Sequence, residues 1–471
     1  MQEFRLPHNY YDGNDAQYGN SLANQYHVDT FDMSGSIFDV FDYSNTEQLV
    51  SQAWIKVESG VNINFESSEG QLNAFTADTV FVDSNIDEEC LDEGCGFQNN
   101  PFKTITRALD MINPTEDNPI TIHLAAGTYS PDMGELFPII MISNVNLIGE
   151  NVDITIIDAL QTNGVIQLEN VSQSQISDIT ITNGYKVDAW NGWFISHSGA
   201  GMYLYNSNPE LYNIIISQNI SDGFGGGIFL KTSNPTLTNI IIKENTAGQG
   251  GGIYLNGYET YPILNNVIIV DNTAFWGGGI YLNESNPKLF NSIIFNNNGE
   301  SGLGIYSMNN NPNIIPKITN SIIDDIYIWF DTTSPIITYS NIENGWEGEG
   351  NIDADPLFTD PENGDYTLQQ DSPCIDSGTA DLDGDGIDDI TDYIGLAPDM
   401  GAYEFGESSE IMAGDTNFDG IVDILDIVIT VNIIMGFEEA QTGQFETADI
   451  NGDGLLDILD LVIMVNIILA D

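Results

Sequence analysis

Apolar and polar positions recur along the middle of the chain with a period of about 25 residues. Each period opens with a glycine-rich phrase that ends in an apolar, an aromatic and an aliphatic residue, as in Gly-Gly-Gly-Ile-Tyr-Leu at 250–255. Two further β-prone runs follow, and Gly, Pro or Asn separates the three runs. The aligned apolar residues of successive phrases are Met202, Ile228, Ile253, Ile280 and Ile305. A period of this length without a helical pattern predicts a solenoid.

Three short strands in each period predict an all-β fold, a parallel β-helix in which every repeat forms one coil. Successive coils would stack at the ordinary interstrand spacing of about 4.8 Å. A leucine-rich horseshoe is the alternative, but its leucine spacing is absent and glycine triplets do not fit it. The ends of such a stack need covers. At the front, the segment from Asn100 and Pro101 to Ile112 predicts an amphipathic helix of about three turns, capped by Asn100.

Asparagine recurs in register in two columns of the predicted coil. The first column is Asn213, Asn239, Asn266 and Asn291, and the second is Asn219, Asn245, Asn272 and Asn297. Stacked Asn side chains can form hydrogen bonds from coil to coil, and Asn tolerates the left-handed backbone conformation found in tight turns. We therefore expect the Asn side chains to form ladders along the stack.

Side chains alternate between the two faces of a strand, which places the aromatic residue of each phrase on the outer face. These residues are Tyr203, Phe229, Tyr254, Tyr281 and Tyr306. Such a column can stack on sugar rings, with Lys231 as a polar contact beside it. Alternatively, the rings form a ladder that stabilises the strands. An insertion at 185–198 interrupts the period here, and its Trp190, Trp193 and His197 are the strongest candidate for a glycan site, because loops on rigid scaffolds commonly carry binding function.

Several motifs outside the repeat resemble those of secreted bacterial right-handed parallel β-helix proteins of the pectate-lyase-like superfamily. They are Phe81-Val-Asp-Ser-Asn85, Asn100-Pro-Phe-Lys-Thr-Ile105, Ala126-Gly-Thr-Tyr129 and Asn146-Leu-Ile-Gly149 near the front, and Asp353-Ala-Asp-Pro-Leu-Phe358, Ser372-Pro-Cys-Ile-Asp376 and Asp399-Met-Gly-Ala-Tyr-Glu404 near the end. The superfamily includes lyases, hydrolases, adhesins and non-catalytic surface proteins. The resemblance therefore implies the fold but no particular activity.

The catalytic groups of the enzymes in that superfamily are incomplete in this sequence. Lyases abstract a proton with Arg or Lys, but Arg5 and Arg107 both lie outside the repeats. Lys231, Lys243 and Lys288 remain as candidates in the coils, but the strongly negative surface would repel a polyuronate substrate. Hydrolases use paired carboxylates, and the adjacent Asp324 and Asp325 would face opposite ways on a strand. We assign no catalytic residue and do not expect catalysis, with a polysaccharide lyase or glycoside hydrolase as the alternative.

Two copies of an oxygen-rich loop lie near the C-terminal end, 34 residues apart. In each copy Asp or Asn occupies loop positions 1, 3, 5, 9 and 12, glycine occupies position 6, and a backbone carbonyl is available at position 7. The first set is Asp415, Asn417, Asp419, Ile421, Asp423 and Asp426, and the second is Asp449, Asn451, Asp453, Leu455, Asp457 and Asp460. The carboxylates of each loop repel one another, and calcium relieves that repulsion with many flexible oxygen ligands. We therefore expect one calcium ion in each loop.

A third loop with the same spacing lies between the repeats and these two copies. Its ligands would be Asp381, Asp383, Asp385, Ile387, Asp389 and Asp392. No apolar helix follows this loop. We expect it to hold a third, structural calcium ion, and a solvated acidic turn is the alternative.

The two paired loops, each followed by an apolar stretch, resemble a type I dockerin, a module that binds cohesin domains. The resemblance covers 414–471 and includes the Asp that ends each loop. It implies that Ile424, Leu425, Ile458 and Leu459 contact the partner. The near-identity of the two halves implies a quasi-two-fold binding surface. A calcium-stabilised cap that packs on the β-helix is the alternative.

Charge and cysteine content narrow the classes of partner. The chain has 471 residues, with 71 Asp or Glu and 9 Lys or Arg, which gives a net charge of −62. Such a charge argues against nucleic acid and anionic lipid as partners, and we expect no membrane insertion because no apolar run is long enough. Cys90 and Cys95 are close enough in sequence to pair, but three cysteines leave the redox state open.

These features predict an extracellular protein, secreted or attached to a cell surface, with five segments. They are an unassigned β-rich segment at 1–78, the β-helix at 79–350, a closing segment with the third loop at 351–406, a linker at 407–413 and the dockerin-like module at 414–471. We expect this module to bind a cohesin-like domain or a surface scaffold while the β-helix presents a face to a polysaccharide or a cell surface. A structural subunit that self-assembles into filaments or arrays is a further alternative.

Overall fold

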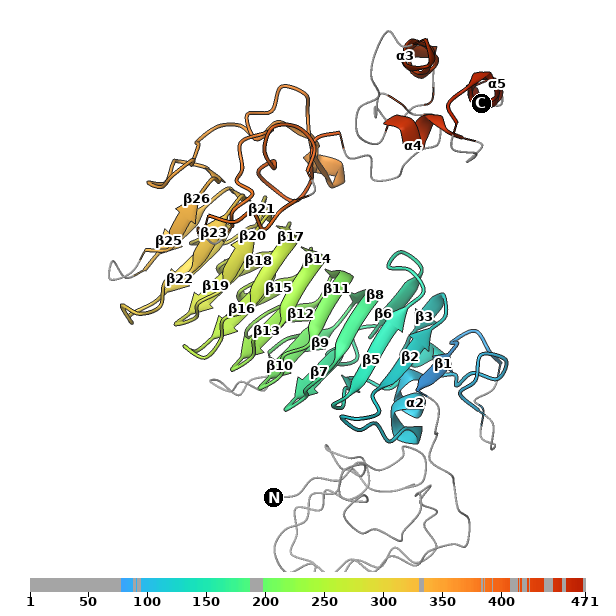
Figure 1. Ribbon diagram of the computed structural model, residues 1–471. Coiled ribbons are helices and arrows are strands. Elements are labelled where there is room, and N and C mark those ends of the chain that lie inside the picture. The colour runs from blue at the N-terminus through green and yellow to red at the C-terminus, as the bar shows by residue number, and fades with distance from the viewer. Residues whose placement is uncertain are drawn as a thin grey trace, which may run out of the picture.

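The computed structural model of the chain is a parallel β-solenoid followed by short helices (Figure 1). The residues that the structure describes are 78–87, 90, 95–186, 198–329, 334–382, 384, 386–391, 393–406, 414, 416, 422, 424–435, 444–450 and 455–468. The predicted segment at 1–78, apart from its last residue, and the predicted linker at 407–413 therefore lie outside the described residues.

Three parallel sheets make up the described part of the solenoid. The fifteen-stranded sheet contains β1 (Thr79–Val82), β2 (Ile120–Leu124), β3 (Gly127–Tyr129), β5 (Val145–Gly149), β6 (Thr155–Asp158), β8 (Gln175–Thr182), β11 (Glu210–Ser217), β14 (Thr236–Lys243), β17 (Ile263–Val270), β20 (Lys288–Phe290), β21 (Ile293–Phe295), β23 (Lys317–Thr319), β24 (Ile322–Ile323), β26 (Ile336–Thr338) and β27 (Asn341–Ile342). The eight-stranded sheet contains β4 (Ile139–Ile140), β7 (Ile166–Glu169), β10 (Met202–Tyr205), β13 (Ile228–Lys231), β16 (Ile253–Asn256), β19 (Ile280–Asn283), β22 (Ile305–Met308) and β25 (Ile326–Ile328). The four-stranded sheet contains β9 (Tyr185–Lys186), β12 (Ile220–Ser221), β15 (Thr246–Gln249) and β18 (Thr273–Trp276).

The remaining described elements are short. Two antiparallel strands, β28 (Phe358–Asp360) and β29 (Asp365–Leu368), belong to the closing segment. The helices are α2 (Ile105–Met111), α3 (Ile424–Ile434), α4 (Gln444–Ala448) and α5 (Ile458–Ile468), with 3-10 turns η1 (Pro131–Met133) and η3 (Pro361–Asn363). No helix among the described residues has the length and apolar character needed to cross a membrane.

The register of the strands confirms the predicted repeat and the parallel β-helix. Met202 of β10 pairs with Ile228 of β13, and the column continues in register through Ile253 and Ile280 to Ile305. Each central coil has three strands, one in each sheet, as in the coil formed by β10, β11 and β12. Inward-facing Ile, Leu and Val side chains of all coils form one continuous core. Each such side chain contributes about 1.5–3 kcal/mol by its burial.

The buried asparagine column forms the ladder that the sequence predicts. The side-chain amide of Asn219 donates to the side-chain oxygen of Asn245 (2.9 Å), Asn245 donates to Asn272 (3.0 Å), and Asn272 donates to Asn297 (3.0 Å). The backbone N–H groups of the first three residues donate to the same oxygens. All four side chains are buried, so water does not compete for these hydrogen bonds.

The other asparagine column adopts the left-handed backbone conformation. The φ angles of Asn213, Asn239, Asn266 and Asn291 are 50°, 56°, 56° and 47°. The pairing of β11 with β14 and of β14 with β17 skips these residues, so each long strand bends there. The side chain of Asn266 donates to Asn239 (2.7 Å), but Asn291 donates to Asn265 and Asn213 donates to Asp178 (2.7 Å). The hydrogen bonds of this column therefore do not form the regular ladder that the sequence predicts.

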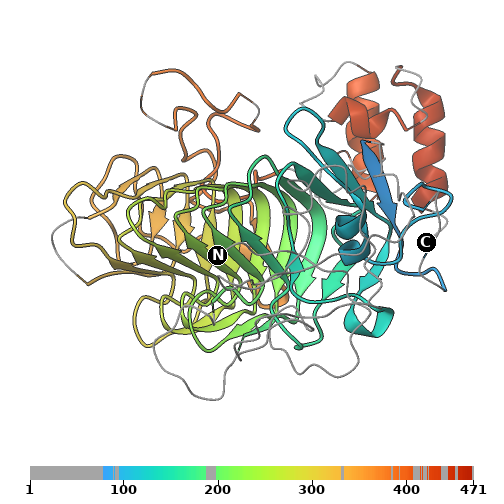
Figure 2. The same cartoon turned by 90° about the horizontal axis from the view of Figure 1, so that it is seen from below.

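The helix at the front of the solenoid is shorter than predicted. α2 begins at Ile105, and its cap is Thr104, whose Oγ1 accepts the backbone N–H of Arg107, rather than Asn100. Phe102 lies outside the helix because it forms a bridge with Val82 of β1. The apolar face of α2 is buried, and the helix covers the end of the solenoid that contains β1 (Figures 1 and 2).

A buried carboxylate holds α2 in place. Glu135 accepts hydrogen bonds from the backbone N–H groups of Ile105 (2.6 Å) and Thr106 (3.1 Å) at the start of the helix. The hydroxyl of Thr106 also donates to Glu135. Burial raises the pKa of Glu135, and these donated hydrogen bonds oppose that rise. The positive end of the helix and these donors together compensate for the buried charge.

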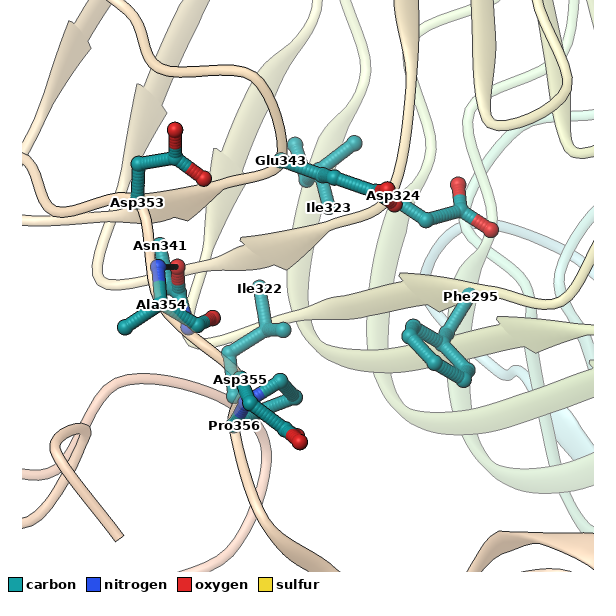
Figure 3. Close-up of a pocket in the computed structure, with 10 residues that line it drawn as sticks. All are labelled: Phe295, Ile322, Ile323, Asp324, Asn341, Glu343, Asp353, Ala354, Asp355 and Pro356. Carbon is teal, nitrogen blue, oxygen red and sulfur yellow. Dashed lines mark hydrogen bonds between the residues drawn. The ribbon is translucent and has the colours of Figure 1, made fainter.

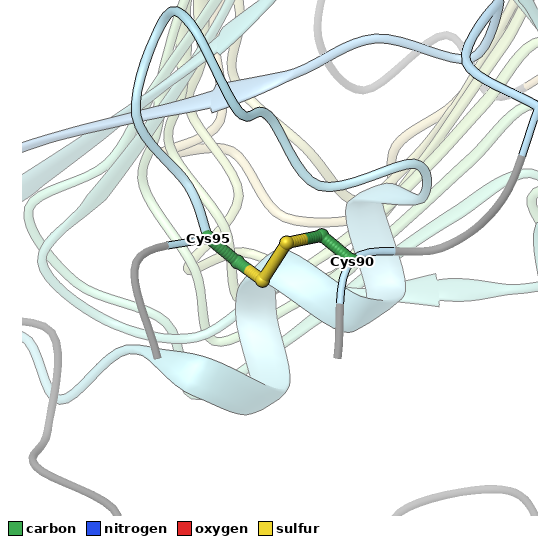
Figure 4. Close-up of a disulfide and its surroundings, with 2 residues drawn as sticks. All are labelled: Cys90 and Cys95. Atoms are coloured by element: carbon green, nitrogen blue, oxygen red, sulfur yellow. A yellow bond between two sulfur atoms is a disulfide. The ribbon is translucent and has the colours of Figure 1, made fainter. Parts of the chain in front are cut away.

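Cys90 and Cys95 form a disulfide, with their Cα atoms 5.7 Å apart (Figure 4). Cys95 is buried and belongs to the main core, and Figure 4 shows the disulfide beside α2. The third cysteine, Cys374, is a buried thiol. The pairing that the sequence left open is therefore present in the structure.

The closing segment builds a second hydrophobic core on the outside of the solenoid. Ile268, Ile293 and Ile322 lie on the outer face of the fifteen-stranded sheet and contact Phe358 and Met400 of the closing segment. These outward isoleucines are buried as fully as many inward ones. The closing segment is therefore packed against the strands through apolar contacts.

Candidate functional site

The aromatic residues of the glycine-rich phrases stack into a continuous ladder on the eight-stranded sheet. Ring centroids from Tyr203 through Phe229, Tyr254 and Tyr281 to Tyr306 are 4.9–5.7 Å apart, with interplanar angles of 7–18°. Four of the five, from Phe229 onward, are at most 5% exposed, and Phe224, Trp276 and Met308 pack against them. The prediction that these four rings stack on sugars is wrong, because they are covered. They stabilise the stacked strands instead.

The other residues of the predicted glycan site lie apart from one another or outside the described chain. Tyr203 is half-buried at the start of the ladder. The Lys231 ammonium lies 5.5 Å from the ring centroid of Tyr205 in the neighbouring strand, a cation–π contact. Trp190, Trp193 and His197 fall outside the described residues, so their role in glycan binding stays a prediction.

The ladder continues beyond the predicted column. Tyr327 of β25 stacks on Tyr306 with centroids 5.3 Å apart, and the centroid of Trp329 is 6.3 Å from Tyr306. Both added rings are exposed. They escaped prediction because the coil that contains β25 lacks the glycine-rich phrase and begins after Asp324 and Asp325. The alternation of Asp325, Tyr327 and Trp329 is the signal that could have revealed them.

A cavity of about 450 Å³ lies where the closing segment crosses the fifteen-stranded sheet (Figure 3). Phe295, Ile322 and Ile323 supply apolar walls, and 353–356 lines the other side. Four carboxyl groups line the cavity, those of Asp324, Glu343, Asp353 and Asp355. In Figure 3 the side chain of Glu343 extends toward Asp324.

The carboxyl group of Asp324 is perturbed by its surroundings. Its Oδ1 atom is buried without a hydrogen-bond partner. Burial raises the pKa of Asp324 to about 7, and the carboxylates of Asp325 and Glu343 contribute to the rise. Asp325 instead accepts the backbone N–H of Leu303 through Oδ2 (2.8 Å). A carboxyl group that keeps its proton near neutral pH beside other carboxylates can act as a general acid.

We expect Asp324 to make folding stability fall as pH rises from about 4 to about 7. In that window the unfolded chain loses the proton and the folded chain keeps it, since the pKa rises from 3.8 to about 7 on folding. The corresponding loss is at most about 4 kcal/mol. Asp324→Asn removes this contribution, so urea denaturation should show a shallower pH dependence than in the wild type. Asp117→Asn, at an exposed aspartate that does not contribute to the pKa shift of Asp324, should keep the wild-type slope, and an unchanged slope in Asp324→Asn would contradict the assignment.

The C-terminal helices carry a duplicated apolar surface. α3 and α5 are in contact, and residues 34 positions apart in the two helices are exposed to nearly the same extent. Ile424 and Ile458 are 69% and 70% exposed, and Val428 and Val462 are 51% and 53% exposed. Leu459 is also exposed, whereas the side chain of Leu425 lies outside the described residues. The helices begin at Ile424 and Ile458, so the predicted partner-binding residues lie in their first turns.

Two predicted calcium ligands are buried carboxylates in a module whose sequence contains no Lys, Arg or His. Asp426 and Asp460, at position 12 of the two loops, are fully buried. Oδ1 of Asp426 accepts the N–H of Thr416 (2.8 Å), and Oδ2 of Asp460 accepts the N–H of Asp457 (2.9 Å). No Lys, Arg or His follows Lys317 in the sequence. Buried carboxylates require a counter-charge, and a calcium ion fits this donor set.

The structure describes only some of the other predicted ligands of these loops. Asp449 is half-buried, Leu455 is exposed, and Asp457 accepts the N–H of Leu459 at the start of α5. Asp415, Asn417, Asp419, Ile421, Asp423, Asn451 and Asp453 lie outside the described residues. Among the residues that are described, three or more potential metal ligands do not gather at one point. The calcium sites therefore stay predictions at the level of individual ligands.

The third loop is organised by its first aspartate. Asp381 accepts the backbone N–H of Gly384 through Oδ1 (2.7 Å) and that of Gly386 through Oδ2 (2.8 Å). Asp389 accepts the N–H of Leu382 (2.9 Å), and the side chain of Ile387 is exposed. Asp383, Asp385 and Asp392 lie outside the described residues, and calcium binding here stays a prediction.

Comparison with known families identifies the two parts of the chain. Residues 413–469 match the type I dockerin domain, and residues 90–323 match a family described as "Protein of unknown function (DUF1565)". Dockerin domains bind cohesins, and those of type I usually bind calcium. No curated protein matches the sequence.

Several solved structures of polysaccharide-related enzymes resemble the chain distantly. Pectate lyase Pel9A is 12% identical, with coverage of 69% of this chain and 96% of the lyase and a TM-score of 0.43. Pectin methylesterase PemA from Erwinia chrysanthemi is 13% identical, with coverage of 62% and 98% and a TM-score of 0.36. The pectin methylesterase from Yersinia enterocolitica is 16% identical, with coverage of 54% and 95% and a TM-score of 0.36. At these TM-scores the similarities carry no activity over to this chain.

The strand register, the duplicated helices and the family matches lead to the same assignment. The chain is a parallel β-solenoid protein with a type I dockerin domain at its C-terminal end.

Proposed function

We propose that the protein is an extracellular β-solenoid that a calcium-loaded dockerin domain attaches to a cohesin-bearing scaffold, where the solenoid contacts glycans. The observation that carries the proposal is the duplicated apolar surface of α3 and α5. The surface exposes four apolar side chains, those of Ile424, Val428, Ile458 and Val462. Soluble proteins rarely expose contiguous apolar patches to water unless a partner covers them. The near-equal exposure of the two halves supports binding of the partner in either orientation.

Calcium would occupy both dockerin loops, and a third ion would occupy the loop at 381–392. Asp426 and Asp460 would each compensate part of an ion's charge from position 12. In the third loop, Asp381 and Asp389 would contribute carboxylate oxygens and Ile387 a backbone carbonyl. The metal would order the loops and fix the first turns of α3 and α5, which carry the apolar surface.

An extracellular location is supported by two features of the chain. Disulfides such as Cys90–Cys95 persist in oxidising compartments. A net charge of −62 keeps a protein soluble, and its many carboxylates can bind calcium where calcium is present at millimolar concentration.

The docking proposal is tested by charged substitutions on the duplicated surface. We expect Val428→Asp alone to leave binding of a type I cohesin nearly unchanged, because the second half of the surface remains. Val428→Asp with Val462→Asp should weaken binding at least about 100-fold, which corresponds to about 2.7 kcal/mol. Calorimetric titration in calcium gives both affinities, and Tyr212→Ala on β11 is the control. Equal binding by the wild type and the double variant would contradict the proposal.

Acid-catalysed glycan hydrolysis is a second candidate function, favoured by the cavity that Asp324 and Glu343 line. The protonated carboxyl group of Asp324 would serve as the acid and one of the other carboxylates as the base. Release of oligosaccharides from a polysaccharide by the wild type, and its loss in Asp324→Asn, would support this function. No release from a panel of neutral and acidic polysaccharides would exclude those substrates.

A further inference from the structure

The last strand of the eight-stranded sheet presents a carboxylate and two aromatic rings on one face. Side chains alternate along a strand, so Asp325, Tyr327 and Trp329 share the outer face, and Ile326 and Ile328 are less exposed. Tyr327 is 40% and Trp329 is 53% exposed. β25 is the edge strand of this sheet, at the end of the described solenoid opposite α2 (Figure 1).

The exposed rings are held in place by the buried ladder. Tyr327 lies on Tyr306 at 5.3 Å with an interplanar angle of 20°, so one of its faces is covered and its position is fixed. The ring of Trp329 lies 6.5 Å from Tyr327 at an angle of 49°, which forms a corner between the two rings. Rings fixed in this way lose little conformational freedom when they bind a ligand.

A second pair of aromatic residues borders the same ladder end. Trp276 of β18 is 6.4 Å from Tyr306, and Phe275 meets Trp276 edge-on at 4.8 Å. Phe275 is 47% exposed. We use the term aromatic platform for Phe275, Trp276, Tyr327 and Trp329. Tyr327, Trp329 and Trp276 adjoin the covered ring of Tyr306, and Phe275 adjoins Trp276. Phe229, Tyr254 and Tyr281, earlier in the ladder, are buried.

We propose that the aromatic platform binds pyranose rings of a neutral polysaccharide. Flat aromatic faces contact the apolar C–H faces of sugar rings, and Asp325 beside them supplies a carboxylate that can accept hydrogen bonds from hydroxyl groups. The net charge of −62 opposes the approach of an anionic polymer. The inference rests on the proposed glycan contact of the solenoid, and it moves that contact from the buried rings to the exposed end of the ladder.

The proposal is tested by titrating the full chain in calcium with cellohexaose and with xylohexaose, and with polygalacturonate as the charged comparison. We expect the wild type to bind at least one neutral hexasaccharide and to prefer it to polygalacturonate. Trp329→Ala and Tyr327→Ala should each weaken that binding at least about tenfold, which corresponds to about 1.4 kcal/mol. Tyr212→Ala, which removes an exposed Tyr from a different sheet, should keep the wild-type affinity.

Three results would overturn the proposal: no binding of either neutral hexasaccharide, stronger binding of polygalacturonate, or equal binding by the wild type and Trp329→Ala. Sedimentation that shows wild-type dimers, dissociated by Trp329→Ala without any saccharide binding, would assign the platform to a second copy and also overturn it. Trp329→Ala should bind cohesin as the wild type does. The two proposals are therefore tested independently. A negative result with the saccharides does not affect the proposal that the dockerin domain binds cohesin, and a negative result with cohesin does not affect the proposal that the aromatic platform binds sugars.

Discussion

Removal of calcium is expected to unfold the dockerin domain while the β-solenoid stays folded. At millimolar calcium, an ion bound with a dissociation constant of about 1–10 μM stabilises the folded state by about 3–4 kcal/mol. Two such ions together stabilise the folded state by about as much as the whole free energy of unfolding of a small domain. Without them, the buried carboxylates of Asp426 and Asp460 have no counter-charge from their own module.

Differential scanning calorimetry in calcium and in a chelator measures this effect. We expect a separate transition of the dockerin domain in calcium, its disappearance in the chelator, and a solenoid transition that stays nearly unchanged. The solenoid is insensitive because its coils depend on the aliphatic core and on strand pairing. Magnesium at the same concentration should restore the lost transition less well than calcium, since it fits flexible multi-oxygen loops poorly. A calorimetric trace that does not respond to the chelator would show that the loops fold without metal.

The second large effect is expected from the buried asparagine ladder. Asn245→Ala removes the amide that donates to the backbone oxygen of Ile216 (2.9 Å) and to Asn272 (3.0 Å). It also removes the oxygen that accepts two hydrogen bonds from Asn219. Buried groups left without partners cost about 1–3 kcal/mol each. We therefore expect the free energy of unfolding to fall by about 3–5 kcal/mol.

Chemical denaturation of the solenoid measures that loss, with Asn283→Ala as the matched control. Asn283 donates to Asn256 across the same kind of strand pair (2.9 Å), but this contact is only half-buried. The control should therefore cost about 1 kcal/mol. Similar losses for both variants would mean that the buried ladder contributes no more than an ordinary surface contact.

The repeat made the solenoid predictable, because each coil specifies its own strands and corners. The register of Met202 with Ile228 and of Asn219 with Asn245 follows directly from the spacing of the phrases. The front helix was harder to predict, since its start depends on a tertiary contact. Phe102 pairs with Val82 of β1, so the helix cannot begin at Pro101.

The burial of the aromatic ladder could not be predicted from alternation alone. Alternation correctly placed Tyr254 and Tyr281 outside the coil, but their exposure depends on what packs over them. Phe224 and Trp276, which belong to other parts of the coil, cover the ladder. The exposed rings of Tyr327 and Trp329 lie where that cover ends, in a coil whose sequence departs from the repeat. The cavity beside Asp324 likewise depends on 353–356, which folds back over the strands.

The dockerin domain was predictable from ligand spacing and duplication. The 34-residue offset relates Ile424 to Ile458 and Val428 to Val462, and the structure gives each pair nearly equal exposure. α3 and α5 begin at position 10 of each loop, ahead of the apolar stretch that follows the loop in the sequence. Those first turns carry Asp426 and Asp460, so metal binding and helix formation share the same residues.

Calcium-dependent binding of the dockerin domain to a cohesin is tested most directly by calorimetric titration of the wild-type chain with type I cohesins, in calcium and after chelation. We predict one-to-one binding with a dissociation constant below about 1 μM to at least one of these cohesins, and complete loss of that binding in the chelator. Absence of binding to every type I cohesin tested in calcium, or binding that persists in the chelator, would contradict this prediction.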